Sequence, residues 1–316
     1  MRQFYILLLF VLAVPNLLPA QCWESQSTPT TAQLRATHFT DAQTGWACGA
    51  NGTLLHTTNG GENWTAQSSG VNTVLYDLFF TDSNNGWAVG SRGTILKTSN
   101  GGSSWSAQDA GTATNLYSIY MANANEGWIT GACGLLLRTT NGGSSWQQQS
   151  SGLSYHLYDV AFNGSLGIAT GGNGTVLRST DGGNSWQSGF SSGSGNWRGL
   201  GVRGNSFVIA NTDGEVGLVN ADATGYTAVS TPGGGSWQSI AVATEQDWYL
   251  CGRNGTLLRT ADAGNTWTSE STNTNADLYG ISVIPGADAW ATGSAGTIVS
   301  ACSSNPPPGG DGGTVG

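Results

Sequence analysis

Two aspartates carry the acid–base chemistry that this sequence could support. Asp77 and Asp159 occupy equivalent positions in an internal repeat, two copies apart. Facing carboxyl groups are the machinery of glycoside hydrolysis, in which one protonates the leaving oxygen and the other activates water or attacks the sugar. The three histidines have no metal-like spacing, and no nucleophile motif is present. We therefore expect no metal and no cofactor, and we keep a glycosidase using Asp77 or Asp159 as the alternative to a non-catalytic protein.

A second set of residues suits binding instead of catalysis. Aromatic side chains with a few arginines are the composition of protein and glycan contact surfaces. Strand alternation places the first strands, the loops before them and the second-to-third-strand turns at one face of the fold. The contact residues predicted there are Arg35, Tyr76, Arg92, Tyr117, Tyr158, Trp197, Arg198, Trp237, Arg253 and Tyr279. For any single tyrosine, packing of an inner strand explains the repeated position better.

A polar phrase that ends in tryptophan sets the period of the repeat. It occurs as TTNGGENW, TSNGGSSW, TTNGGSSW, STDGGNSW and TADAGNTW, ending at Trp64, Trp105, Trp146, Trp186 and Trp267, with spacings of 41, 41, 40 and 81 residues. The last spacing is two periods with a degenerate copy between them. The residue that closes the second apolar run of each copy gives seven copies: Gly49, Gly90, Gly131, Gly171, Asn211, Gly252 and Gly293.

Each copy contains four short apolar runs separated by turn signals, as at 75–80, 86–90, 94–98 and 105–108. This pattern predicts one antiparallel meander per copy. Repeated seven times, it predicts an all-β fold, a seven-bladed β-propeller of four-stranded antiparallel blades.

The ring is predicted to close through the two ends of the chain. The seventh copy stops after its third strand, and the sequence from residue 22 matches the missing fourth one, so the N-terminal strand should complete the last blade and leave no open edge. Cys22 and Cys302 align with the two sides of the turn that this blade lacks. We predict a disulfide between them worth about 2–4 kcal/mol. Cys48 and Cys251 should be buried, and Cys133 has no assigned role.

Composition and chain ends bear on location and partners. The chain has 10 basic and 19 acidic residues, which argues against nucleic acid and anionic lipid. Residues 1–20 have the features of a signal peptide, and residues 303–316 read as a Pro/Gly-rich linker or tail, so the propeller would span 21–302. We expect a secreted, periplasmic or cell-surface protein without membrane insertion, either a monomer or a module of a longer surface protein.

The repeated phrase resembles the Asp-box (BNR) motif. In STDGGNSW, Asp181 can accept hydrogen bonds from its own turn, the glycines allow positive φ, and Trp186 leads into the core. The residues assigned this structural role are Asn59, Trp64, Asn100, Trp105, Asn141, Trp146, Asp181, Trp186, Asp262 and Trp267. Asn at three of the Asp positions makes a metal site there unfavourable. These turns should lie on the outer rim, away from a ligand-binding face.

Seven copies of the pattern GWAxGxxGTLLxTxNGGxxW are similar to the photosynthesis system II assembly (stability) factor family of seven-bladed propellers. That resemblance implies a non-catalytic scaffold that holds an assembly intermediate through an arginine-rich patch. Arg35, Arg92, Arg198 and Arg253 are the nearest match to such a patch. We therefore expect an exported, non-catalytic protein that contacts a protein or glycan through one rim, with an Asp-box glycoside hydrolase as the alternative. A second basic series is expected on a solvated strand face or in cross-strand pairs: His56, Lys97, Arg138, Arg178 and Arg259.

Overall fold

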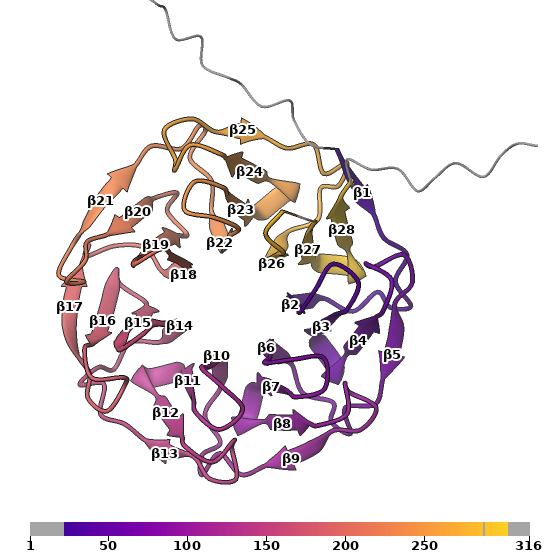
Figure 1. The fold of residues 1–316 in the computed structure, drawn as a ribbon, viewed down its shortest axis with the longest axis horizontal. Coiled ribbons are helices and arrows are strands. Elements are labelled where there is room, and N and C mark those ends of the chain that lie inside the picture. Colours follow the sequence, from indigo (N-terminus) through magenta and orange to yellow (C-terminus); the bar gives the residue numbers. More distant parts are fainter. Residues whose placement is uncertain (1–21, 287, 303–316) are drawn as a thin grey trace, which may run out of the picture.

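Each repeat folds into one radial sheet, and seven sheets close into a ring (Figure 1). The computed structural model describes residues 22–286 and 288–302. Every sheet has four antiparallel strands, which confirms the predicted seven-bladed propeller. Within the described ranges, no helix has the length and apolar character needed to cross a bilayer. The predicted signal peptide at 1–20 and tail at 303–316 lie outside the described residues.

Within each blade, each successive strand of the chain lies farther from the axis than the one before it. The last blade differs only in that its outermost strand comes from the N-terminus. Blades 1 to 3 contain β2 (Leu34–Phe39), β3 (Gly45–Gly49), β4 (Leu54–Thr57) and β5 (Thr65–Gln67); β6 (Leu75–Phe80), β7 (Gly86–Gly90), β8 (Ile95–Thr98) and β9 (Ser106–Gln108); β10 (Leu116–Met121), β11 (Gly127–Gly131), β12 (Leu136–Thr139) and β13 (Gln147–Gln148). Blades 4 and 5 contain β14 (Leu157–Asn163), β15 (Leu166–Gly171), β16 (Thr175–Ser179) and β17 (Gln187–Ser191); β18 (Trp197–Arg203), β19 (Ser206–Asn211), β20 (Val216–Val219) and β21 (Tyr226–Val229). Blades 6 and 7 contain β22 (Trp237–Val242), β23 (Trp248–Gly252), β24 (Leu257–Thr260) and β25 (Thr268–Ser269); β26 (Leu278–Val283), β27 (Ala289–Gly293), β28 (Ile298–Ala301) and β1 (Trp23–Ser25). Short 3-10 turns join the second and third strands in five blades: η1 (Ala50–Gly52), η2 (Ser91–Gly93), η3 (Ala132–Gly134), η4 (Arg253–Gly255) and η5 (Ser294–Gly296).

Burial decreases from the inner to the outer strands. The second strands, such as β7, are buried along their whole length because a blade packs against each of their faces, whereas the fourth strands, such as β9, are mostly exposed. The glycine that begins β7 has a local cause, because a Cβ on Gly86 would collide with the ring of Phe80, its partner on the adjacent strand β6 of the same blade. The repeated phrase GWAVG is therefore the sequence of a strand with no solvated face.

The N-terminal strand closes the ring as predicted. β1 pairs with β28 in antiparallel register, with Trp23 opposite Ala301. The Cys22–Cys302 disulfide joins the same two strands across a sequence separation of 280 residues. Cys48 and Cys251 are buried as predicted, and Cys133 is exposed.

At three of the blade interfaces, the tryptophan of the second strand joins its blade to the next one. The Trp290 indole of blade 7 stacks on Phe39 of blade 1 at 3.5 Å, and its Nε1 donates a 2.8 Å hydrogen bond to the carbonyl of Gly60 in the Asp-box turn of blade 1. Trp46 donates in the same way to the next blade, at Gly101 O (3.0 Å). The Asp-box turn is thus a contact between blades as well as a turn within one.

The polar side chains of the box hold the turn itself. Asp181 Oδ1 accepts a hydrogen bond from the Ser185 N–H at 3.0 Å, and Asn59 Oδ1 accepts one from the Asn63 N–H at 3.0 Å. Asn therefore replaces Asp without loss of the turn. Hydrogen bonds from the Ser185 hydroxyl and N–H lower the pKa of Asp181 to about 2. The box tryptophan completes the unit by packing against the blade cores: Trp64 is 5% exposed, and the other four are half-buried, namely Trp105, Trp146, Trp186 and Trp267.

The second basic series also joins structural elements. Lys97 Nζ donates to Gly142 O of the next blade at 2.9 Å, and Arg178 donates to Asp222 O of the next blade at 2.6 Å. Ion pairs within a blade link Arg138 to Glu126 (2.6 Å) and Arg259 to Asp247 (2.9 Å). His56, the remaining member, stacks on Trp46 with ring centroids 4.8 Å apart, so structural contacts account for the series without a binding site.

Replacing Trp290 with Phe tests the contact between blades. Phe keeps an aromatic stack but removes the Nε1 donor to Gly60 O, so we expect the free energy of unfolding to fall by about 1 kcal/mol more than in a matched control. The control is Trp128→Phe, because Trp128 also stacks on a phenylalanine of the next blade, Phe162, whereas its Nε1 has no hydrogen-bond partner among the described residues. Denaturant titration measures both values. An equal loss in the two variants would contradict the role given to the hydrogen bond.

Removing the disulfide tests the closure of the ring. We expect a Cys22→Ser, Cys302→Ser double variant to lose about 2–4 kcal/mol of unfolding free energy, because the unfolded chain is no longer constrained by a long loop. Cys133→Ser is the control, because Cys133 is exposed and unpaired. Full stability in the double variant under oxidising conditions would show that strand pairing alone closes the ring.

Candidate functional site

A β-bulge near the start of every inner strand builds the site. In each blade the pairing of the first two strands shifts between the first and third residues of the inner strand, as between Leu75 and Asp77. A bulge leaves one residue out of the ladder and redirects its side chain. The bulged residues of blades 1 to 7 are Arg35, Tyr76, Tyr117, Tyr158, Arg198, Gln238 and Tyr279, and all seven line one cavity.

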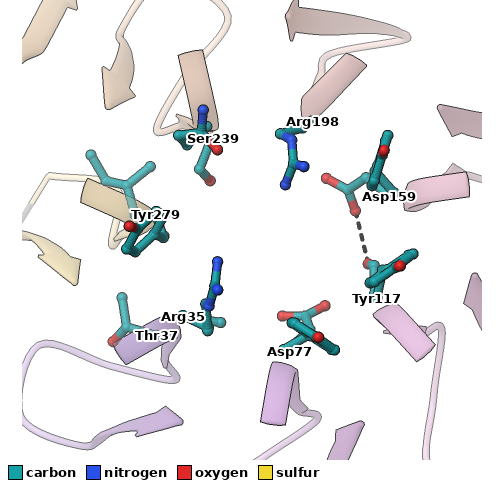
Figure 2. Close-up of a pocket in the computed structure, with 15 residues that line it drawn as sticks. Arg35, Thr37, Asp77, Tyr117, Asp159, Arg198, Ser239 and Tyr279 are labelled. Carbon is teal, nitrogen blue, oxygen red and sulfur yellow. Dashed lines mark hydrogen bonds between the residues drawn. The ribbon is translucent and has the colours of Figure 1, made fainter. Parts of the chain in front are cut away.

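The cavity lies on the propeller axis and has a volume of about 180 Å³ (Figure 2). Its wall is a band of rings and guanidinium groups in mutual contact. Tyr117 lies 5.3 Å from Tyr76 and 5.6 Å from Tyr158, measured between ring centroids. The Arg35 Cζ lies 4.7 Å from the centre of the Tyr279 ring and 5.7 Å from that of Tyr76. Arg198 continues the band, with its Cζ 4.5 Å from the centre of the Tyr158 ring.

The two aspartates are the third residues of their inner strands and line the same cavity. Asp77 accepts hydrogen bonds from the N–H groups of Leu78 (2.8 Å) and Ile119 (2.9 Å), and the second of these crosses to blade 3. Asp159 accepts one from the Ser118 hydroxyl at 2.9 Å, which joins blades 3 and 4 and is the dashed line in Figure 2. Both carboxyl groups therefore tie adjacent inner strands together.

Withdrawal from solvent alters the titration of both aspartates. It raises the pKa of Asp77 to about 6, against the effect of the backbone hydrogen bonds. It raises the pKa of Asp159 to about 8, and the neighbouring charge of Asp77 acts in the same direction. Two carboxyl groups with separated pKa values can act as acid and base. Here the two carboxyl groups also accept hydrogen bonds from the backbone and from Ser118. These bonds give the pair a structural role that is independent of any chemical one.

The predicted contact residues divide into three groups. The cavity brings together Arg35, Tyr76, Tyr117, Tyr158, Arg198 and Tyr279. Arg92 and Arg253 are exposed on the η2 and η4 turns, outside the cavity. These turns bond to the backbone just before the inner strands, as where the Ser91 N–H donates to Val74 O at 2.8 Å, so they lie at the same face.

The prediction that Trp197 and Trp237 form part of a contact surface was wrong. Both side chains are 0% exposed. Each is the first residue of its inner strand, the position that Leu34 and Leu75 hold in other blades, where the side chain points into the blade interface. A residue-by-residue alignment of the repeats could have predicted this burial, because it places both tryptophans at a position that other blades fill with a core leucine.

Three residues escaped the sequence analysis. Gln238 completes the ring of bulged residues, and Ser118 bonds Asp159 from the position that Asp77 and Asp159 hold in their own blades. The alignment could have found both. Tyr155 is 49% exposed in the loop before β14. It adjoins His156, whose ring lies 5.7 Å from Tyr117 and whose Nδ1 accepts the Cys133 N–H at 3.1 Å.

Replacing Asp159 with Asn is expected to change the pH dependence of stability. The pKa of this carboxyl rises from 3.8 to about 8 on folding, so the folded chain keeps a proton that the unfolded chain releases. Its contribution to stability is complete below pH 3.8 and is lost as the pH rises to about 8. The amide has no proton to release, so wild-type stability should fall relative to that of Asp159→Asn across this window and then stay constant. Denaturant titrations at a series of pH values measure the difference.

The difference between the two proteins is the readout because other groups titrate in the same window. Burial lowers the pKa of His38 to about 4, and its contribution to stability is lost as the pH falls, in the opposite sense. The contribution of His38 is the same in wild type and variant, so it cancels in the difference between them. A difference that does not vary between pH 4 and pH 8 would contradict the altered titration of Asp159.

Comparison with known proteins places the chain in a family. A search of curated protein sequences found no match. Among solved structures, YCF48 bound to D1 peptide is 21% identical with a TM-score of 0.76, covering 90% of this chain and 98% of that one. A streptogramin B lyase is 14% identical with a TM-score of 0.77, covering 90% of this chain and 98% of that one. The GH74 xyloglucanase from Xanthomonas campestris is 13% identical with a TM-score of 0.71, covering 88% of this chain and 53% of that one.

At these identities the three structures share only the fold with this chain, and two of them are enzymes. The family model is more specific. The model described as Photosynthesis system II assembly factor YCF48 matches residues 64–151 and 189–301, well over half of the sequence. The chain therefore belongs to the YCF48 assembly-factor family.

Proposed function

We propose that this chain is a non-catalytic binding protein that holds a protein partner at the face where its central cavity opens. The observation that carries the proposal is the band of tyrosines and arginines that runs without a break from blade 7 through blade 1 to blade 5. Tyrosine and arginine are enriched among the residues that contribute most to protein binding. Membership of the assembly-factor family supports the same conclusion.

The surroundings of the cavity supply a wider contact surface. Arg92 and Arg253 on the turns and Tyr155 in the loop before β14 are all exposed. An exposed tyrosine and two exposed arginines at the face where the cavity opens suit a peptide segment that crosses the mouth of the cavity. A solved YCF48 structure holds a D1 peptide, which supports a peptide as the class of ligand.

We also propose that the protein is exported. The apolar N-terminus supports this assignment, and so does the Cys22–Cys302 disulfide, because such bonds persist in oxidising compartments. A secreted, periplasmic or cell-surface location follows from it.

The alternative function is glycoside hydrolysis with Asp77 and Asp159. One observation favours it: both carboxyl groups line a single cavity, and the pKa of each is raised. Their engagement with backbone N–H groups and with Ser118 favours the structural role. Binding is therefore the first proposal.

A peptide display library tests the function. We expect enriched peptides to bind wild type, and a Tyr155→Ala, Arg92→Ala, Arg253→Ala variant to bind them about tenfold more weakly or worse, because hot-spot truncation costs more than about 1 kcal/mol. Calorimetric titration of the enriched peptides measures the change. Glu62→Ala is the control, because Glu62 is exposed in the blade 1 box turn on the outer rim.

Two outcomes would overturn the proposal. In the first, the control and the triple variant lose the same affinity, which would place the contact elsewhere. In the second, wild type releases reducing sugar from a polysaccharide panel and Asp159→Asn does not, which would favour the hydrolase.

A further inference from the structure

Two cations in the central cavity have no ion-pair partner in the part of the chain that the structure describes. Arg35 on β2 and Arg198 on β18 project into the cavity from different sides (Figure 2). Neither forms an ion pair with any residue that the structure describes. The Nε atom of each is buried and has no hydrogen-bond partner within the described ranges. Both side chains are half-buried, and a partly buried cation that lacks a direct ion pair is costly, so an anion bound between the two guanidinium groups would offset that cost.

The tyrosines fix the orientation of both guanidinium groups. Arg198 lies over the Tyr158 ring, and Arg35 lies between the Tyr76 and Tyr279 rings. A guanidinium that packs against a ring face keeps the N–H groups at its edge available for hydrogen bonds. The side chains are therefore held in place before a ligand arrives, which lowers the entropic cost of binding.

The remaining charges of the cavity select the charge of the ligand. Asp159, with its pKa raised to about 8, is protonated at neutral pH, whereas Asp77, with a pKa of about 6, is mostly ionised. Two arginines and one ionised aspartate leave one positive charge in excess. A monoanion balances this excess, whereas a dianion would bring a second negative charge close to Asp77.

We propose that the central cavity binds a carboxylate group, held by the guanidinium groups of Arg35 and Arg198. The paired N–H groups of a guanidinium match the two oxygens of a carboxylate. A volume of about 180 Å³ is that of about six water molecules, so the ligand is a small organic acid or the acidic end of a partner segment. If the ligand is the acidic end of a partner segment, the inference rests on the proposed function. If the ligand is a small organic acid, the inference does not depend on that function.

Titration with acetate and with inorganic phosphate, at constant ionic strength, tests the site. The readout is the NMR resonances of the Arg35 and Arg198 Nε–H groups. We expect acetate to shift both, and Arg35→Gln or Arg198→Gln to weaken its binding about tenfold or more, because a charge-assisted hydrogen bond contributes about 1.5–3 kcal/mol. Gln238 holds the same ring position in blade 6, so the fold accepts this substitution. Arg253→Gln, on the same face but outside the cavity, should leave acetate binding unchanged.

The source of the carboxylate is decided with matched peptides. Peptides enriched by display are compared with versions whose C-terminus is amidated or whose Asp and Glu are replaced by Asn and Gln. Affinity lost on amidation assigns the terminal carboxylate, affinity lost on side-chain replacement assigns an acidic residue, and acetate binding with no peptide effect assigns a free organic acid.

The inference is overturned if acetate shifts neither resonance, or if phosphate binds more tightly than acetate. Its failure is separable from that of the proposed function. Peptides that bind wild type and both arginine variants equally, together with no acetate binding, would support the function and refute the carboxylate site, whereas acetate binding without any enriched peptide would do the reverse.

Discussion

An indole bonded to the backbone of the neighbouring blade joins blade 7 to blade 1, blade 1 to blade 2 and blade 2 to blade 3. Blades have no covalent bond between their sheets beyond the connecting loop, so their stability depends on what each presents to the next. Trp46 and Trp290 present a ring that stacks on a phenylalanine and an N–H that reaches a box carbonyl. The polar turn must have its defined shape because that carbonyl is the acceptor. Where the repeat has Ile168 in place of tryptophan, Arg178 makes the bond to the next blade instead.

The same repetition produces the cavity, through the bulge in each inner strand. Regular strands would place every residue in the ladder, and the seven bulges release one side chain per blade toward the axis. Asp77 and Asp159, one residue further on, hold adjacent inner strands together through Ile119 and Ser118. The packing of the inner strands and the chemistry of the cavity are therefore parts of one arrangement.

Family membership and fold carry different weight here. The YCF48 family model identifies the chain, whereas the propeller alone is shared with a lyase and a xyloglucanase. The evidence for a function of this chain lies in the residues of its cavity. Arg35 and Arg198, which form no ion pair with a described residue, favour an anionic ligand, and the engagement of Asp77 and Asp159 with backbone N–H groups favours a structural role for them.

The sequence by itself determined the number of blades, the closing strand and the Cys22–Cys302 pair. These features follow from the spacing of the repeats and from the strand that the last repeat lacks. It also placed Arg35, Arg198 and four tyrosines at one position, since repetition makes one residue's environment predict another's. Burial was decided only by the tertiary structure: Trp197 and Trp237 read as contact residues yet fill leucine positions between blades. The exposed Tyr155 and the absence of acidic partners for the two arginines in the described chain are also tertiary facts, because both depend on distances between blades that no local pattern encodes.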